Sequence, residues 1–171
     1  MDRKKITLIV GGAASGKSAY AETRVLAATG RPVYIATAEA HDDEMLAKIE
    51  AHRALRAGRG WLTVEAPLDV AAALAGRTEQ EVVLLDCVTM WLSNAMLAGR
   101  DVEGEADRLI EALVSCPAEV TVVTNEVGGG IVPETSLGRR FRAAQGRLNQ
   151  RLAARADHVV TVIAGLPLVL K

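Results

Sequence analysis

The sequence is poor in aromatic residues and nearly neutral in charge. Aromatic side chains make up only 3% of the 171 residues although 50% are hydrophobic, so the core must be built from valine, leucine, isoleucine and alanine. A formal net charge of -1 provides no overall field that would attract nucleic acid or an anionic membrane. Any phosphate-binding site must therefore be local.

Cysteines and long apolar runs are also scarce. Cys87 and Cys116 are far apart and form no CxxC pair, which argues against a disulfide framework or a structural zinc site and suits a reducing cytoplasm. The N-terminal run Ile6–Val10 is too short for a signal-peptide core or a membrane span. We expect a cytoplasmic chain without membrane insertion, whose residues 1–171 form a single domain.

Short runs rich in β-branched residues alternate with longer stretches of helical spacing. The predicted strands are Ile6–Val10, Val33–Ala36, Val82–Leu85, Val120–Val123 and Val159–Ile163, with a short strand at Leu62–Glu65 and an antiparallel edge strand at Leu168–Leu170. The predicted helices are Lys17–Thr29, Asp42–Ala57, Leu68–Ala75, Met90–Leu97, Glu103–Val114 and Ser136–Ala156. This alternation predicts an α/β fold with a mostly parallel sheet covered by helices on both faces.

The first strand runs directly into a phosphate-binding motif. The motif G-x-x-x-x-G-K-[ST] is satisfied by Gly11-Gly12-Ala13-Ala14-Ser15-Gly16-Lys17-Ser18. Its glycines let successive backbone N–H groups converge on phosphate oxygens at the positive end of the next helix. We expect Lys17 to neutralise β- and γ-phosphate oxygens and Ser18 to hold Mg²⁺. Because the motif lies between a strand and a helix, it predicts a P-loop NTPase of the RecA-like type.

Polar residues follow two other predicted strands. Asp86 ends the run Val82–Leu85 and could sit beside Mg²⁺ through a water, although the same position suits an N-cap of the next helix. Asn125 and Glu126 follow another apolar strand, at the edge where open α/β sheets bind ligands. A turn that merely needs the glycines 128–130 explains this second segment nearly as well.

Histidines and arginines give weaker signals. His41, His52 and His158 could each act as a base or nucleophile, and a solvated surface position is the simplest interpretation of His52. A late basic cluster consists of Arg139, Arg140, Arg142, Arg147 and Arg151. At helical spacing it could be a solvated face, a site for a second phosphorylated substrate, or a salt-bridged subunit contact.

A larger pattern joins these motifs. It is carried by Gly11–Ser18, Tyr34–Ala38, Asp42–Met45, Ile49–Arg53, Leu84–Asn94, Thr124–Glu134 and Gly146–Ala153. Over essentially its full length the sequence resembles the bifunctional adenosylcobinamide kinase/adenosylcobinamide-phosphate guanylyltransferase family of cobalamin synthesis. The resemblance implies phosphorylation of the aminopropanol hydroxyl of adenosylcobinamide by ATP or GTP. Transfer of GMP from GTP to the new phosphate then yields adenosylcobinamide-GDP.

The resemblance also implies roles for individual residues. It makes His52 the nucleophile that carries GMP, with Lys17 as the second catalytic residue, Arg53 and Arg56 stabilising charge, and Ser18 and Asp86 at Mg²⁺. The implied nucleotide contacts are Gly11, Gly12, Ala13, Ala14, Ser15, Gly16, Lys17, Ser18, Ala36, Thr37, Ala38, Arg53, Ala54, Leu55, Arg56, Glu65 and Asp86. It further implies a homo-oligomer, a trimer, with sites near subunit contacts.

Two positions depart from the family pattern, and two alternative functions remain open. Family members usually have a basic residue where this sequence has Ala14, so a phosphate contact is weakened here. They usually have an acidic residue where this sequence has Ala143, so the substrate or subunit role of that acidic residue is in doubt. One alternative is another small-molecule P-loop kinase without a covalent step. The other is a GTP-dependent regulatory switch, although such switches normally carry an Asn-Lys-x-Asp motif that this sequence lacks.

Overall fold

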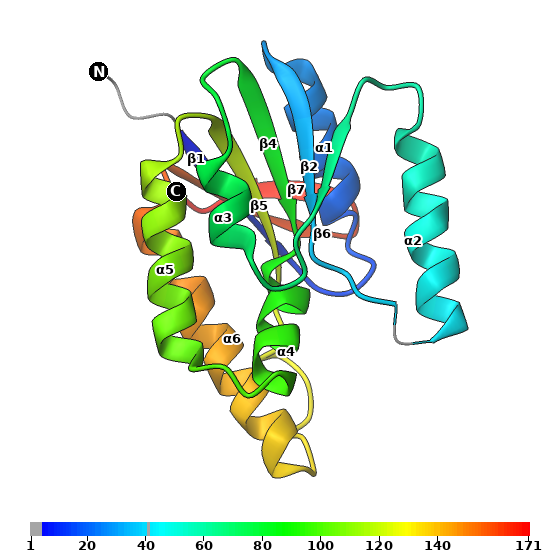
Figure 1. Cartoon of the computed structure of the whole chain (residues 1–171). Coiled ribbons are helices and arrows are strands. Elements are labelled where there is room, and N and C mark those ends of the chain that lie inside the picture. The colour runs from blue at the N-terminus through cyan, green and yellow to red at the C-terminus, as the bar shows by residue number, and fades with distance from the viewer. Residues whose placement is uncertain (1–4, 41) are drawn as a thin grey trace.

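The structure is a computed structural model that describes residues 5–40 and 42–171. This part of the chain contains seven strands and six helices (Figure 1). In chain order they are β1 (Ile6–Gly11), α1 (Lys17–Ala27), β2 (Arg31–Ala36), α2 (Asp43–Arg56), β3 (Leu62–Glu65), α3 (Val70–Ala75), β4 (Glu81–Asp86), α4 (Val88–Leu97), α5 (Val102–Ser115), β5 (Glu119–Asn125), α6 (Ser136–Arg155), β6 (His158–Ile163) and β7 (Leu166–Val169). His41 lies outside the described residues.

The strands form one sheet in the order β3-β2-β4-β5-β1-β6-β7. Every neighbouring pair is parallel except β6 and β7. The predicted α/β class and the antiparallel C-terminal edge strand are therefore confirmed. The edge strand starts at Leu166 rather than Leu168, because Ala164 and Gly165 both adopt positive φ (51° and 77°) and reverse the chain tightly.

Most element boundaries lie close to the predicted ones, and the differences have local causes. The first helix ends at Ala27 rather than Thr29 because Ala28 is already extended (φ -80°, ψ 155°). The helix α4 starts at Val88 rather than Met90 because Cys87 provides its N-cap. The third predicted helix, Leu68–Ala75, starts later than expected, at Val70.

The core consists of two layers that the sheet separates. Alternate residues of a strand face opposite sides, so Leu8 packs in one cluster and Ile9 in the other. The larger cluster joins the sheet to α3, α4, α5 and α6, and the smaller one joins it to α1. Helices cover both faces, as predicted (Figure 1). No described helix has the length and apolarity needed to cross a membrane.

The helix α2 differs from the others because it stands beside the sheet instead of packing on it (Figure 1). Of its residues only Arg56 is buried. Its N-terminus is well defined, since the N–H of Met45 donates to Oδ1 of Asp42 (2.7 Å) and two acidic residues occupy the first turn. Local capping and helix propensity therefore determine where α2 begins, whereas tertiary packing contributes little.

Candidate active site

The P-loop joins the carboxyl end of β1 to α1. Gly16 adopts a left-handed conformation (φ 90°), and a Cβ there would lie 3.1 Å from the Cα of Gly165, so only glycine fits without strain. The N–H of Gly165 donates to the carbonyl of Ser15 (2.8 Å), so the β6–β7 turn supports the loop. Gly16 also caps α1 without a side-chain hydrogen bond, which leaves the first N–H groups of the helix for an anion.

Lys17 is the buried cation of this loop. Only 9% of Lys17 is exposed, and its Nζ donates to the carbonyl of Gly12 (3.0 Å). The ammonium group is thereby held over the loop, where a bound phosphate would neutralise it. Ala14 is exposed and adopts a left-handed conformation (φ 55°). At this position, which departs from the family pattern, the side chain carries no charge, so only the backbone can contact a phosphate.

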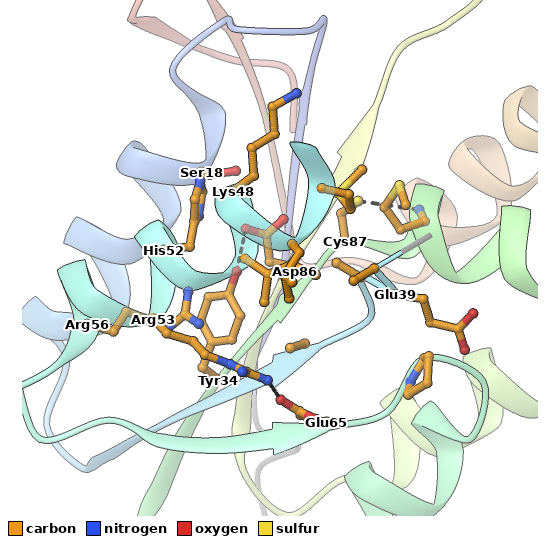
Figure 2. Close-up of a pocket in the computed structure, with 18 of the residues that line it drawn as sticks. Ser18, Tyr34, Glu39, Lys48, His52, Arg53, Arg56, Glu65, Asp86 and Cys87 are labelled. Carbon is orange, nitrogen blue, oxygen red and sulfur yellow. Dashed lines mark hydrogen bonds and ion pairs between the residues drawn. The ribbon is translucent and has the colours of Figure 1, made fainter. Parts of the chain in front are cut away.

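A cavity of about 690 Å³ lies where several elements end (Figure 2). It is lined by Lys17 and Ser18 of α1, Asp86 of β4, Asn125 of β5 and His52 of α2, together with residues of β2 and β3. The carboxyl ends of adjacent parallel strands meet at one edge of the sheet, which explains why residues distant in sequence converge here. The last two residues of the P-loop motif, a carboxylate and an imidazole thus share one space.

Asp86 is fixed by a buried phenol. The hydroxyl of Tyr34 donates to its Oδ2 (2.9 Å), and burial followed by the nearby Asp86 carboxylate raises the pKa of Tyr34, so the phenol stays a neutral donor. The alternative role of Asp86 as an N-cap is wrong. The cap of α4 is Cys87, whose Sγ accepts from the N–H of Met90 (3.4 Å), so the carboxylate remains in the cavity.

The oxygen atoms in the cavity fit a magnesium ion. Ser18 supplies a hydroxyl and Asp86 a carboxylate, both of which are hard ligands that Mg²⁺ prefers. Within residues 5–40 and 42–171 no three His, Cys, Asp or Glu side chains cluster as a metal site. Such an ion would take its other ligands from water and substrate phosphates, as Mg²⁺ in nucleotide sites commonly does.

Cys87 borders the same cavity, and its surroundings disfavour the thiolate that a nucleophilic cysteine needs. Burial, and then the neighbouring Asp86 carboxylate, raise its pKa to about 11, so the thiol stays protonated at neutral pH. Its backbone is held by Thr37, whose hydroxyl donates to the carbonyl of Cys87 (2.7 Å) and accepts from its N–H (2.9 Å). Thr37 is completely buried and lies outside the cavity lining.

Arg56 brings a second positive charge to the cavity. It is only 6% exposed, and its guanidinium carbon lies 3.6 Å from the centroid of the Tyr34 ring. The ring of Trp61 packs edge-on against Tyr34, at 5.8 Å between centroids. Nε and Nη1 of Arg56 and Nε1 of Trp61 are buried without a hydrogen-bond partner. A buried cation with spare donors is suited to an anionic ligand.

Comparison with known proteins decides what this site belongs to. The family model described as "Cobinamide kinase / cobinamide phosphate guanyltransferase" matches residues 7–170. The chain belongs to this family. It is 44% identical over 168 residues to the bifunctional adenosylcobalamin biosynthesis protein CobP of Pseudomonas aeruginosa, covering 96% of each chain. It is 42% identical over 180 residues to the corresponding protein CobU of Escherichia coli K12, covering 96% of this chain and 98% of that protein.

Solved structures support the fold alone. A RadB recombinase matches with a TM-score of 0.55 at 16% identity, over 93% of this chain and 74% of that chain. A type III secretion system ATPase matches with a TM-score of 0.59 at 11% identity, over 93% of this chain and 51% of that chain. These neighbours agree with the predicted RecA-like fold. The chain is thus a cobinamide kinase and cobinamide-phosphate guanylyltransferase on that fold, and this bifunctional family supports neither the single-step kinase nor the regulatory switch.

In this transferase the helix α2 supplies one wall of the cavity. Residues at i, i+3 and i+4 spacing line it: Met45, Lys48, Ile49, His52, Arg53 and Arg56. His52 is exposed on that face, and the Arg53 guanidinium pairs with the carboxylate of Glu65 at the end of β3 (Figure 2). Met45, Lys48 and Ile49 were not predicted as site residues, although their helical spacing from His52 could have identified them.

The remaining nucleotide-contact predictions divide into two groups. Ala36, Ala38 and Glu65 line the cavity, whereas Ala54 and Leu55 are exposed on α2 and do not. Tyr34 and Trp61 were not predicted as site residues, because an aromatic residue in or beside a strand has no local feature that distinguishes a cavity wall from a core position. The contact of Tyr34 with Arg56, and that of Trp61 with Tyr34, arise only in the folded chain.

The fold separates His158 and the late basic cluster from the cavity of the P-loop. His158 starts β6 and pairs with Thr7, at the opposite end of the sheet from the P-loop. In the basic cluster, Arg147 and Arg151 pair with acidic residues of α5, Glu103 among them. Arg139 and Arg142 donate to backbone carbonyls of the loop after β5, beside a second cavity of about 590 Å³ that Ala143 also lines.

Proposed function

We propose that this enzyme guanylylates adenosylcobinamide phosphate through a covalent GMP intermediate on His52. The observation that carries the proposal is the shared cavity, since His52 lines the same space as Lys17, Ser18 and Arg56. A nucleophile, a phosphate-binding loop and an excess of positive charge are the parts that nucleotidyl transfer requires.

The guanylyl step consists of two successive substitutions at the α-phosphorus of GTP. A neutral imidazole nitrogen of His52 attacks the α-phosphorus of GTP, the bond from that phosphorus to the bridging oxygen breaks, and pyrophosphate leaves. Arg53 and Arg56 offset the charge that develops on the α-phosphate oxygens. A phosphate oxygen of adenosylcobinamide phosphate then attacks the same phosphorus. The P–N bond breaks, and adenosylcobinamide-GDP and free His52 result.

The kinase step uses the same phosphate cradle. The aminopropanol hydroxyl of adenosylcobinamide attacks the γ-phosphorus of ATP or GTP, and the nucleoside diphosphate leaves. The backbone of residues 11–16 and the ammonium of Lys17 hold the phosphates during transfer. Ser18 and Asp86 would hold Mg²⁺, which when bound neutralises phosphate charge. The remaining predicted contacts, including Thr37, Ala54 and Leu55, stay part of this proposal.

We also propose a domain organisation, a compartment and an oligomeric state for the enzyme. Both reactions would occur in one domain spanning residues 1–171, in the cytoplasm and in a homotrimer. Cys87 and Cys116 are both free thiols, which suits a reducing compartment. Apolar side chains exposed along β7, at the edge of the sheet, are compatible with a subunit contact.

The test of the covalent step is incubation with GTP labelled at the α-phosphate. The wild-type protein should acquire an adduct that is labile in acid and stable in alkali, and His52→Ala should abolish it. The matched control is His158→Ala, which removes an exposed histidine at the opposite end of the sheet and should label normally. Label at the γ-phosphate should not be retained by either protein.

One result would contradict the covalent step. If the wild-type protein phosphorylates cobinamide and releases cobinamide-GDP yet never acquires α-label, GMP passes directly between the substrates. Labelling that persists in His52→Ala would instead assign the nucleophile to another residue.

A further inference from the structure

Asn125 occupies a central position beside the phosphate cradle. It is the last residue of β5, the strand between β1, which leads into the P-loop, and β4, which ends in Asp86. In the sheet register Asn125 pairs with Gly11, the first glycine of the P-loop motif, and the next N–H, that of Glu126, donates to the carbonyl of Gly11 (3.0 Å). Asn125 lines the cavity that Lys17 and Ser18 also line.

The backbone of Asn125 is held on both sides, by the buried side chain of Thr89 and the partly buried side chain of Asn149. Its N–H donates to Oγ1 of Thr89 (2.8 Å), and its carbonyl accepts from Nδ2 of Asn149 (3.0 Å). Asn149 is itself fixed, because its Oδ1 accepts from the hydroxyl of Thr124 (2.6 Å) and from Nε2 of Gln145 (2.8 Å). Thr124 and Gln145 are both 0% exposed. A buried polar network of this kind rigidifies the residue that it holds.

The side chain of Asn125, by contrast, has no hydrogen-bond partner among the described residues. Its Oδ1 is buried without a hydrogen-bond partner, and across residues 5–40 and 42–171 its carboxamide makes no hydrogen bond. An unpaired buried polar atom is costly, and natural proteins keep few of them. The two backbone hydrogen bonds explain where residue 125 lies. They do not explain why it is asparagine, because any residue except proline, which has no N–H, could form both of them.

The carboxamide is chemically suited to the end of a triphosphate. Its NH₂ group can donate to phosphate oxygens without adding negative charge, while its oxygen can accept from a hydroxyl or water beside them. The neighbouring Glu126 is exposed, and its carboxylate accepts from the N–H of Gly128 rather than lining the cavity. Of Asn125 and the residue that follows it, only Asn125 lines the cavity and can therefore meet a phosphate in the cradle.

We propose that the carboxamide of Asn125 contacts the terminal phosphoryl group of the bound nucleoside triphosphate and so distinguishes triphosphate from diphosphate. This inference rests on the nucleotide site proposed above and adds a residue to it. The contact would place the group to be transferred in the kinase step and would weaken once that group has left. Thr89, Thr124, Gln145 and Asn149 are then positioning residues for Asn125.

The test compares the affinities for GTP and GDP by isothermal titration calorimetry, in a His52→Ala background in which no GMP adduct can form. Asn125→Ala should weaken GTP binding about tenfold, as expected for a lost hydrogen bond to a charged group, and GDP binding less than about twofold. Asn125→Asp should weaken GTP binding further, because it adds negative charge beside the phosphates. Gln80→Glu, the same amide-to-acid change at an exposed position, should leave both affinities unchanged.

The outcomes separate this inference from the function on which it rests. Equal weakening of GTP and GDP binding by Asn125→Ala, accompanied by a lower unfolding temperature, would show a structural role and overturn the inference. Unchanged affinities for both nucleotides would overturn it as well. If the GTP-specific loss is observed although His52 never carries GMP, the covalent step fails and the role of Asn125 stands. If the His52→Ala protein binds neither GTP nor GDP, the result refutes both the proposed nucleotide site and the role of Asn125.

Discussion

At the level of single residues, Arg56 shows a conflict between stability and ligand binding. Its guanidinium is almost fully buried, and two of its nitrogens have no hydrogen-bond partner, which is costly for a charged group. The stacking on Tyr34 recovers part of this cost. Such a residue is difficult to explain by folding alone. It is readily explained if a nucleotide phosphate supplies the missing partner.

Arg56→Met tests this balance. Methionine fills a similar volume without a charge, so we expect the free energy of unfolding to stay within about 1 kcal/mol of wild type or to rise. GTP affinity should fall about tenfold or more, because a charge-assisted contact is lost. Thermal denaturation and calorimetric titration measure the two effects, with Arg59→Met as an exposed control. A large loss of stability with unchanged GTP affinity would make Arg56 a structural residue instead.

Among the secondary-structure elements, α2 carries the proposed nucleophile on the least supported helix. α2 and α5 both contain 14 residues, yet α2 buries only Arg56 whereas α5 buries Glu105, Ala106, Leu109, Ile110 and Leu113. Isolated helices of this length are marginal in water, so the stability of a helix in a protein depends on packing. The cavity wall formed by α2 is therefore the part of the site most dependent on a ligand.

Hydrogen exchange of the nucleotide-free protein should report this difference. We expect backbone amides of α2 to exchange roughly 100-fold faster than those of α5, since local opening costs less where few apolar contacts are broken. Added GTP should slow exchange in α2 and leave α5 unchanged, and α5 thus serves as the internal control. Mass spectrometry of peptides from the two helices measures both. Equal protection of α2 and α5 without nucleotide would contradict the argument.

For the molecule as a whole, the sequence was most informative where function depends on local pattern. The alternation of strands and helices predicted the fold, and the motif between Gly11 and Ser18 predicted the strand–loop–helix arrangement that joins β1 to α1, because both depend on neighbouring residues. The Cys87 cap was missed because cysteine is not among the residues that usually cap helices. The stacking of Arg56 on Tyr34 joins α2 to β2, and no local pattern encodes it.

His52 marks the boundary between the two kinds of information. Its spacing was equally consistent with an ordinary surface residue, and only the family resemblance suggested that it carries GMP. The structure adds that His52 lines the cavity of the P-loop and that His158 lies at the far end of the sheet. The position of His158 thus argues against it as the nucleophile, and the labelling experiment tests the covalent role of His52.

The edge of the sheet offers a test of the proposed trimer. Apolar side chains are exposed at the end of β6 and along β7: Ile163, Leu166, Leu168 and Val169. An open edge strand with apolar side chains favours association with another chain.

Light scattering should give a mass about three times the 18.1 kDa of one chain, and Leu168→Lys should lower this mass if β7 forms the contact. Leu97→Lys, an exposed change at the end of α4, should leave the mass unaltered. A trimer that survives Leu168→Lys would move the interface away from β7, and a monomeric wild type would refute the trimer itself.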